Sequence, residues 1–252
     1  MYGGRKFISL LKKCRDCGFV FQDPIINAAE HYQESNPDNY IKMGKFRLEY
    51  FLKLKEEISK RIPLSDQTKF VDLGAGSGEW LQCFKTKEKY ATEINDKLIA
   101  LLKKKNIKVL SEITEIEKIT QETELIISAF DYLEHVKNPD QFLREISSTS
   151  NSKTYLILGV PDMGKFAAKL LGTRYYLYTP MHYSYFNAKS LEKLLSKYLL
   201  DIEIFRSPSM KSDLEGVFKW LRIKAPDFIK QISFPIPYRA SLIAVGRIIN
   251  AN

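Results

Sequence analysis

The sequence is poor in cysteine and has no long apolar run. Three Cys residues among 252 are too few for a disulfide-rich scaffold, and two of them form the pair Cys14-Arg-Asp-Cys17. No stretch approaches the roughly 18 apolar residues that span a bilayer, and the first residues show no signal-peptide pattern. Repeats and low-complexity tracts are also missing. We therefore expect a cytoplasmic, globular protein with reduced thiols.

Acidic residues are fewer than basic ones. The sequence has 39 Lys and Arg residues and 30 Asp and Glu residues, a formal net charge of +9. The excess is uneven, because residues 63–163 carry 13 basic and 16 acidic residues, whereas residues 164–252 carry 14 and 6. A basic surface attracts nucleic acid, an anionic substrate or an anionic membrane, and it also keeps a protein soluble. The charge alone leaves these alternatives open.

From Lys69 onward, short β-rich runs alternate with helical patterns, which is typical of a doubly wound α/β sheet with helices on both faces. Asp96 and Asn138 are the expected N-caps of two of the helices. The predicted strands are 69–73, 90–94, 108–110, 125–129, 155–160, 201–205 and 241–247. The predicted helices are 40–61, which precedes the sheet, and 79–84, 96–105, 139–147 and 190–199.

We expect two parts in the chain. Residues 1–39 read as a short hairpin around the Cys pair and a polar linker over 34–39, and residues 40–252 read as one domain. Two segments, 161–187 and 206–240, lie between predicted strands and helices of this domain, and we interpret them as insertions.

The strongest chemical signal is the sequence FVDLGAGSGEW at residues 70–80, a strand that passes through a glycine-rich turn into a helix. Glycines allow positive φ and let a ligand lie directly on backbone amides. Glu93 follows about 20 residues later, where an acid in a nucleotide-binding sheet accepts hydrogen bonds from ribose hydroxyls; alternatively it is an ordinary carboxylate near a helix start. Asp72, at the start of the loop, would repel phosphate and suits a ligand with an ammonium group.

This segment resembles motif I of class I S-adenosylmethionine-dependent methyltransferases. The resemblance covers about residues 69–247 and implies a seven-stranded Rossmann-like sheet, an antiparallel last strand and S-adenosylmethionine as cofactor. In the family, the first acid and the glycines hold the methionine part and the second acid holds the ribose. The residues expected to bind the cofactor are Asp72, Gly74, Ala75, Gly76, Gly78, Glu93, Ile94, Ser111, Glu112, Phe130 and Asp131.

The fourth predicted strand leads into SAFDYLEHV at residues 128–136. The order Tyr-x-Glu-His resembles that of deoxysugar C-methyltransferases, which implies catalytic roles for Tyr132, Glu134 and His135. Methyl transfer to a hydroxyl or a C–H group needs a base, and imidazole titrates in the right range. In other relatives the Glu-His pair only braces the loop, so both roles stay open. No Asn-Pro-Pro-Tyr or Pro-Cys follows this strand, which disfavours methylation of nucleobases.

The first insertion is rich in aromatic residues. Aromatic faces stack on sugars or bases, and Arg binds phosphate or carboxylate, so we expect Arg174, Tyr176, His182 and Tyr183 to contact the substrate, with His182 as a second candidate base. The block resembles the His-x-x-Phe insertion of polysaccharide and deoxysugar methyltransferases, with one more residue between His and Phe. Alternatively the aromatics pack a lid. Residues 218–224 are interpreted as a membrane-surface, lid or dimer helix.

The Cys pair lies in a segment, residues 10–24, that resembles the second knuckle of the zinc ribbon found before the deoxysugar methyltransferase core. A closed zinc site needs four ligands, and the upstream pair is missing. We therefore expect no zinc at Cys14 and Cys17, although His31 and a second subunit would offer further ligands. Relatives with an intact ribbon also carry a further C-terminal domain, which we do not expect here, and this leaves O-methylation as open as C-methylation.

Together these patterns predict a methyltransferase that acts on a small, anionic substrate such as a nucleotide-linked or other sugar, in sugar or polysaccharide biosynthesis. Nucleic acid is disfavoured as a partner, and a peripheral membrane contact stays open. The two rival hypotheses are an RNA methyltransferase that uses the basic flanks, and a non-catalytic cofactor-binding partner of another enzyme. The sequence does not determine the acceptor atom or the oligomeric state.

Overall fold

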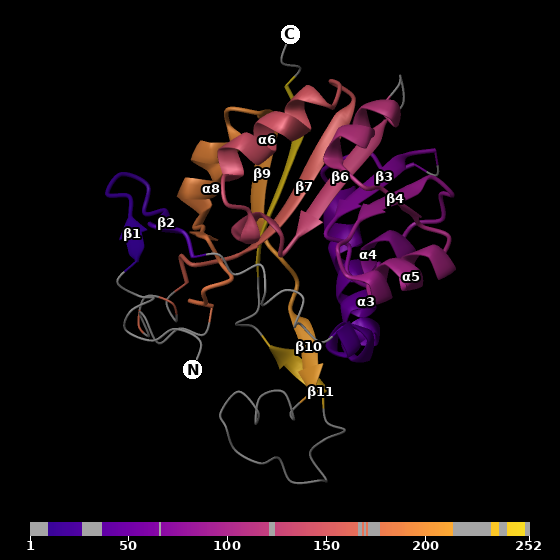
Figure 1. Ribbon diagram of the computed structural model, residues 1–252, viewed down its shortest axis with the longest axis horizontal. Helices are drawn as coiled ribbons and strands as arrows, with labels where there is room; N and C mark the ends of the chain where they lie inside the picture. Colours follow the sequence, from indigo (N-terminus) through magenta and orange to yellow (C-terminus); the bar gives the residue numbers. More distant parts are fainter. Residues whose placement is uncertain are drawn as a thin grey trace.

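The centre of the fold is a seven-stranded mixed sheet (Figure 1). The computed structural model describes residues 10–26, 37–65, 67–120, 124–165, 168, 170, 177–213, 233–236 and 241–249. The strand order is β5-β4-β3-β6-β7-β12-β9. The strands are β3 (Lys69–Leu73), β4 (Lys89–Thr92), β5 (Lys108–Val109), β6 (Leu125–Phe130), β7 (Thr154–Pro161), β9 (Leu199–Arg206) and β12 (Ser241–Ile248). Strands β3 to β7 pair in parallel and β12 is antiparallel to both neighbours. The predicted fold class is confirmed.

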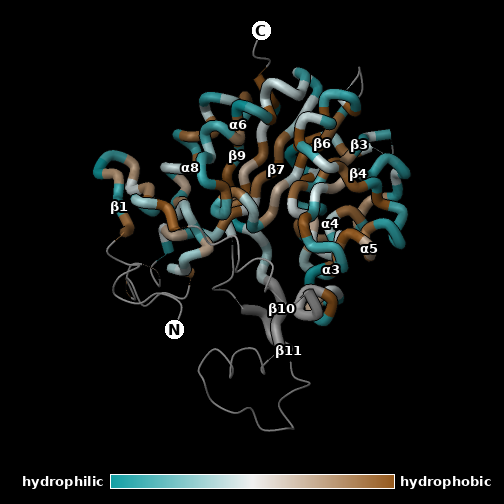
Figure 2. The backbone as a smooth tube through the Cα atoms, viewed as in Figure 1, coloured by the Kyte–Doolittle hydropathy of each residue, from teal (hydrophilic) through white to brown (hydrophobic). Residues whose placement is uncertain are grey.

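Helices cover both faces of this sheet (Figure 1). On one face lie α3 (Pro37–Ser59), α4 (Glu79–Gln82) and α5 (Asp96–Lys104), and on the other lie α6 (Pro139–Ser148) and α8 (Ala188–Leu195). Alternate strand residues serve the two sides, so Phe70 packs under α3 and α4 whereas Val71 packs in the core under α6 and α8. Figure 2 shows the hydrophobic strands inside and hydrophilic turns outside.

Several predicted boundaries are wrong by a few residues. The N-cap of α5 is Asn95 and not Asp96, because the Asn95 side chain accepts from the amides of Lys97 and Leu98. The predicted cap Asn138 is confirmed by its bond from Gln141. The helix predicted over 190–199 ends at Leu195, since β9 already begins at Leu199. The linker predicted over 34–39 is also too long, because α3 begins at Pro37.

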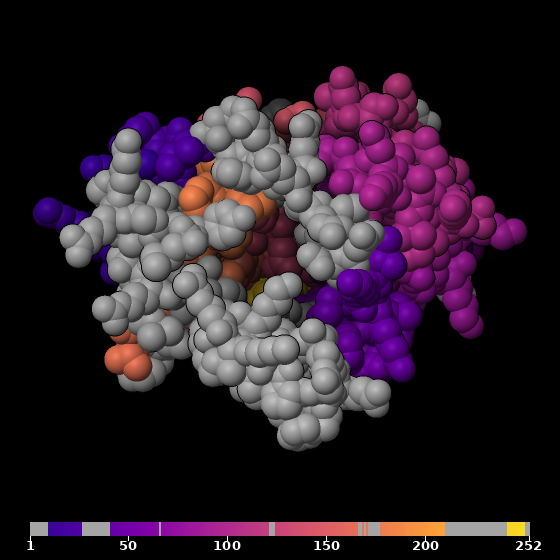
Figure 3. All heavy atoms as spheres, turned by 60° about the horizontal axis from the view of Figure 1, so that its bottom comes forward, coloured from indigo at the N-terminus to yellow at the C-terminus, as the bar shows by residue number. Residues whose placement is uncertain are grey.

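The chain reverses its winding direction at β3, which places a crevice at the carboxyl ends of β3 and β6. From β3 the chain proceeds through α4 to β4 on one side, and later returns to β6 on the other side. Ligands of doubly wound sheets bind at such a switch point. Figure 3 shows the face at which the parallel strands end, where the surface is hollowed between α3 (purple) and the segment containing α8 and β9 (orange).

Smaller strands flank the main sheet and were not predicted individually. β1 (Leu11–Lys13), β2 (Val20–Gln22) and β8 (Ser184–Tyr185) form an antiparallel three-stranded sheet, so the N-terminal hairpin pairs with the first insertion. In the second insertion, β10 (Met210–Asp213) pairs with β11 (Ser233–Ile236), and β10 lies beside α3. The predictions for His31, Arg174, Tyr176 and the 218–224 helix concern residues outside the described part. No helix of the described part is long and apolar enough to cross a membrane.

Candidate active site

The glycine loop joins β3 to α4 in a left-handed path. Gly74, Gly76 and Gly78 have φ angles of 67°, 56° and 80°. A Cβ on Gly74 would lie 2.5 Å from the ring of Tyr132, and one on Gly78 would lie 2.7 Å from the Leu102 side chain. Two of the predicted glycines therefore serve close packing, because Gly74 receives the Tyr132 ring and Gly78 lets α4 approach α5.

Asp72 is buried at the end of β3, with 4% of its surface exposed. Its register partner on β6 is Ser128, whose hydroxyl donates to Asp72 Oδ1 at 2.7 Å. Burial raises the pKa of Asp72 to about 7, against the lowering effect of the Ser128 hydrogen bond. A carboxylate held in this position is stabilised by a cationic ligand. This is the property that a ligand ammonium group would use.

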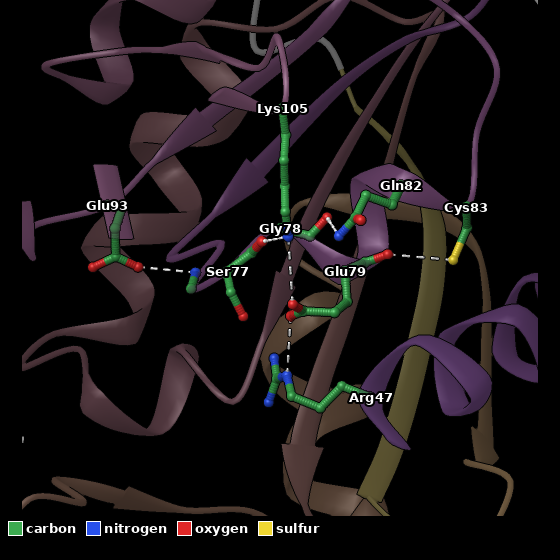
Figure 4. Close-up of polar contacts among 9 residues, drawn as sticks. Arg47, Ser77, Gly78, Glu79, Gln82, Cys83, Glu93 and Lys105 are labelled. Carbon is green, nitrogen blue, oxygen red and sulfur yellow. Dashed lines mark hydrogen bonds and ion pairs between the residues drawn. The ribbon is translucent and has the colours of Figure 1, made fainter. Parts of the chain in front are cut away.

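Glu93 follows β4 and turns back to the glycine loop (Figure 4). Its Oε2 accepts from the Gly76 amide at 2.8 Å, and its Oε1 accepts from the amides of Ile94 at 2.8 Å and Asn95 at 3.0 Å. The carboxylate thus braces the loop and the start of α5 at the same time. A carboxylate has about four lone-pair sites, so hydrogen bonds from ribose hydroxyls remain compatible with this arrangement.

A buried carboxylate on α4, which sequence reasoning missed, ties the glycine loop to two helices (Figure 4). Glu79 pairs with Arg47 of α3 at 3.4 Å and with Lys105 at 3.8 Å. Lys105 also donates to the Ser77 carbonyl at 2.6 Å. The acid next to the loop is visible in the sequence, but its partners lie tens of residues away and no local pattern identifies them.

Phe130 ends β6 in an aromatic cluster beneath the crevice. Its ring centroid lies 5.1 Å from those of Phe51 and Trp80, which belong to α3 and α4. Asp131 follows with a positive φ of 51°, and its amide donates to the Gly159 carbonyl at 2.8 Å. Helix α3 therefore contributes directly to the wall next to the predicted cofactor residues, a role that the sequence did not indicate beyond packing.

Ser111 and Glu112 lie after β5, at the same edge of the sheet. Glu115 Oε1 accepts from both of their amides, at 2.7 and 3.1 Å. The Glu112 side chain caps the short 3-10 helix η1 (Ile113–Lys118) in return. These contacts give the pair a local structural role, and contact with the cofactor stays a prediction for both.

The predicted catalytic residues come together around the 3-10 turn η2 (Leu133–His135). The rings of His135 and His182 are in edge-to-face contact, with centroids 4.7 Å apart. Glu134 is 2% exposed, and neither of its carboxylate oxygens has a hydrogen-bond partner among the described residues. Ligating atoms of Glu134, His135 and His182 all lie within 4.8 Å of one another. The structure thus joins residues from the two separate sequence motifs.

Burial shifts the pKa of each group in this cluster toward its neutral form. Desolvation raises the pKa of Glu134 well above its usual value, and the nearby Asp131 carboxylate raises it further. Desolvation lowers the pKa of His135, although its Nδ1 lies 2.8 Å from the Met181 carbonyl oxygen. Desolvation and the neighbouring His135 lower the pKa of His182 to about 3. Both imidazoles are therefore neutral at pH 7.

The N-terminal hairpin holds the segment that carries His182. The Gln22 side-chain amide on β2 donates to the carbonyls of Pro180 at 2.9 Å and His182 at 2.8 Å. The Tyr183 carbonyl accepts from the backbone amide of Gln22 at 3.0 Å, and the Tyr183 backbone amide donates to the Glu134 carbonyl at 2.7 Å. The Tyr183 side chain is buried, and its predicted role in substrate contact stays a prediction. Sequence reasoning missed Gln22, since no pattern relates residues 160 positions apart.

A cavity of about 840 Å³ opens between the hairpin, the first insertion and the ends of β7 and β9. Its charged lining residues include three cations, Lys13, Lys189 and Arg206, and one carboxylate, Asp162. Arg206 Nε lies 3.3 Å from Asp162 Oδ2. This volume is in the range of small-molecule sites, and its lining gives it a positive character.

Cys14 and Cys17 occupy the turn between β1 and β2 as free thiols. Hydrogen bonds from the Cys17 and Asp16 amides lower the pKa of Cys14. Within the part of the chain described, no third metal-ligating residue joins the pair. The expectation that it holds no zinc stays a prediction.

The sequence matches the family described as "Methyltransferase domain" over residues 43–203. This match spans more than half of the chain and includes the glycine loop, Glu93 and η2. The chain belongs to this family of methyltransferase domains. It is an S-adenosylmethionine-dependent methyltransferase, as the motif I resemblance implied. No curated protein matches the sequence.

Solved methyltransferase structures share the fold. A Thermotoga maritima S-adenosylmethionine-dependent methyltransferase, described as a possible histamine N-methyltransferase, has a TM-score of 0.53 at 15% identity, over 87% of this chain and 95% of that one. An S-adenosylmethionine-dependent methyltransferase from Archaeoglobus fulgidus has a TM-score of 0.52 at 18% identity, over 83% of this chain and 99% of that one. The plantazolicin methyltransferase BpumL, solved with S-adenosylhomocysteine, has a TM-score of 0.51 at 15% identity, over 88% of this chain and 91% of that one. At these identities the likeness supports the fold alone.

The residues of the crevice fit the methyltransferase cofactor. Asp72 is a buried carboxylate that a ligand ammonium group would neutralise, and the Glu93 carboxylate retains acceptor capacity beside the loop amides. When bound, S-adenosylmethionine supplies a methyl group on a sulfonium. Asp72, the glycine loop and Glu93 would hold it, and Phe130 and Asp131 would border it at the end of β6. These residue assignments remain predictions.

Proposed function

We propose that this methyltransferase transfers the methyl group to an oxygen or carbon atom of a small anionic molecule, such as a nucleotide-linked or other sugar. The observation that carries the proposal is the contact between two neutral imidazoles, His135 and His182, beside the buried Glu134 carboxyl. A hydroxyl or C–H acceptor must lose a proton during methyl transfer. Neutral imidazole is the side-chain group suited to receive it near pH 7.

The geometry favours His135 as the first candidate base. Its Nδ1 bonds to the Met181 carbonyl, which fixes the ring orientation and leaves Nε2 as the basic nitrogen. His182 packs against it and is the second candidate. Tyr132 lies between the glycine loop and η2, where it would orient the reacting groups together with Glu134.

The basic cavity supports an anionic acceptor. Lys13, Lys189 and Arg206 line it from three separate elements, and it opens at the edge of the sheet where β7 and β9 end. Cations converging on one hollow suit phosphate or carboxylate groups. Arg174 and Tyr176 would complete the substrate contacts. The hairpin around Cys14 and Cys17 fits a remnant of the zinc ribbon seen in sugar-pathway relatives, with residues 40–252 as the methyltransferase domain proper.

A methyl-transfer screen tests the proposal. Purified protein is incubated with S-adenosylmethionine and nucleotide sugars, sugar phosphates or lipid-linked sugars, and release of S-adenosylhomocysteine is measured. We expect activity on at least one phosphorylated sugar and its loss, by more than about 100-fold, in the His135→Gln variant. Activity on RNA or uncharged metabolites alone would contradict the substrate assignment. Full activity of both His135→Gln and His182→Gln on a substrate would contradict the base assignment.

A further inference from the structure

In the part of the chain that the structure describes, no neighbouring residue donates a hydrogen bond to the buried Glu134 carboxyl group. Both oxygens are buried, and neither accepts a hydrogen bond from the described residues. The carboxylate of Asp131 acts on it repulsively. Burying a carboxylate without a counter-charge or a donor is costly. A positive ion beside Glu134 would therefore offset the cost of burying its carboxylate.

The two neighbouring imidazoles are held as metal-binding histidines are. His135 directs Nδ1 to the Met181 carbonyl at 2.8 Å, and the His182 ring bonds to the Leu177 backbone. A histidine that donates one ring N–H to a backbone carbonyl presents its other nitrogen as a ligand. The ligating atoms of Glu134, His135 and His182 lie within 4.8 Å of one another, so small side-chain shifts bring them onto one ion.

We propose that Glu134, His135 and His182 bind one divalent transition-metal ion of the zinc, cobalt or manganese type. Two imidazoles with one carboxylate favour such ions over magnesium or calcium, which prefer all-oxygen sites. Three protein ligands leave coordination positions open, which is typical of catalytic rather than structural sites. Cys14 and Cys17 belong to a different element and are not part of this site.

The site would select the acceptor, an extension that rests on the proposed function. A hydroxyl oxygen bound at the open position becomes more acidic. Its proton would pass to water, the oxygen would bond to the methyl carbon, and the C–S electron pair would stay on the sulfur of the departing S-adenosylhomocysteine. This arrangement favours O-methylation of a hydroxyl-bearing acceptor. His135 and His182 would then act as ligands, so activation of the hydroxyl by the metal would replace the base role proposed for His135, while methyl transfer to a small acceptor stays as proposed.

Cobalt titration of the metal-stripped full-length protein tests the site directly. We expect wild type to bind one Co²⁺ per chain and to develop the visible absorption of a nitrogen- and oxygen-ligated ion, without a thiolate charge-transfer band. Glu134→Gln and His182→Gln should each weaken Co²⁺ binding by more than about 100-fold, beyond the roughly 10- to 100-fold typical of groups that only support a ligand. The matched control, Cys14→Ser with Cys17→Ser, should bind Co²⁺ like wild type.

Binding of S-adenosylhomocysteine, measured on every variant, separates the outcomes. Wild type that binds S-adenosylhomocysteine but no Co²⁺ would overturn the metal site and leave the proposed function intact. Loss of cobalt in the Cys double variant, or a thiolate band in wild type, would move the metal to the hairpin and overturn the proposal. If a variant no longer binds S-adenosylhomocysteine, its cobalt result is set aside. The cobalt spectra of wild type and the Cys double variant then test the proposal, since they show whether thiolates or nitrogen and oxygen atoms bind the ion.

Discussion

Asp72 has opposite effects on folding and on cofactor binding, because its buried charge destabilises the free protein and would attract a ligand ammonium group. It lies in the interior at the end of β3, where burial raises its pKa from 3.8 to about 7. Between these pH values the folded protein keeps a proton that the unfolded chain has lost. Stability therefore falls as the pH rises through this window, and the full cost is present above about pH 7. A ligand ammonium would recover part of that cost, so cofactor binding and folding depend on the same carboxyl group.

Asp72→Asn should therefore stabilise the free protein and weaken cofactor binding. The amide oxygen can still accept from the Ser128 hydroxyl, while the ionisation cost disappears. At neutral pH we expect a gain in unfolding free energy of about 4 kcal/mol at most, which vanishes toward pH 4, and a loss of S-adenosylhomocysteine affinity of about 10- to 100-fold. Denaturant unfolding at several pH values and calorimetric titration measure both. Equal stability of the two proteins above pH 7 would contradict the burial of a charged Asp72.

The residues predicted to bind the cofactor form a local pattern in the sequence, and the structure brings Glu93 to the glycine loop. Asp72 and the three glycines lie within seven positions of one strand-turn-helix pattern, and Glu93 directly follows the next strand, β4. Arg47 and Lys105, which fix Glu79 beside the loop, could not be predicted in the same way. Their positions follow from how α3 and α5 pack against the sheet, which no short pattern encodes.

Among the elements, the N-terminal hairpin has a part in the site that the sequence only hinted at. Its Cys pair resembles half of a zinc knuckle. In the structure, Gln22 on its second strand holds the loop that carries His182. The pairing of β2 with β8 joins segments more than 160 residues apart. A two-residue strand such as β8 has no periodicity of its own, which is why it was not predicted. The strands of the main sheet, including the two-residue β5, were predicted because they alternate with helical patterns along the chain, a context that β8 lacks.

Replacing Gln22 with Leu should loosen the His182 loop without disturbing the cofactor crevice. The change removes the donor to the Pro180 and His182 carbonyls, at a cost of about 1–3 kcal/mol for each polar group left buried and unpaired. Hydrogen exchange of residues 177–185 should become faster, while S-adenosylhomocysteine affinity stays within about twofold of wild type. Lys12→Ala, on the exposed side of β1, is the control. Unchanged exchange in the loop would show that Gln22 does not hold it.

At the scale of the whole molecule, part of the positive charge lies around one cavity. The net charge of +9 is compatible with RNA binding, yet three of its cations, Lys13, Lys189 and Arg206, converge on one cavity at the edge of the sheet. A hollow of this size suits a small anion better than a polynucleotide, which needs an extended basic surface. The distribution of charge could not be predicted from composition, because it depends on how the hairpin, α8 and β9 meet.

The cavity should bind pyrophosphate, a probe for the anionic part of a nucleotide-linked acceptor. Pyrophosphate should raise the melting temperature of wild type and have a smaller effect on the double variant Lys13→Ala with Lys189→Ala, because binding to the folded state stabilises it. The control, Lys12→Ala with Lys193→Ala, removes the same charge from the same two elements outside the cavity lining. Equal effects in both double variants would contradict a specific anion site.

The central claim is that the crevice at the ends of β3 and β6 binds the methyltransferase cofactor through Asp72 and Glu93. Calorimetric titration of S-adenosylhomocysteine into wild type, Asp72→Ala and Glu93→Ala tests it most directly. We predict one bound molecule per wild-type chain, and affinity reduced by about 10-fold or more in each variant, with circular dichroism confirming that all three are folded. No binding by folded wild type, or equal affinity in all three proteins, would contradict the claim.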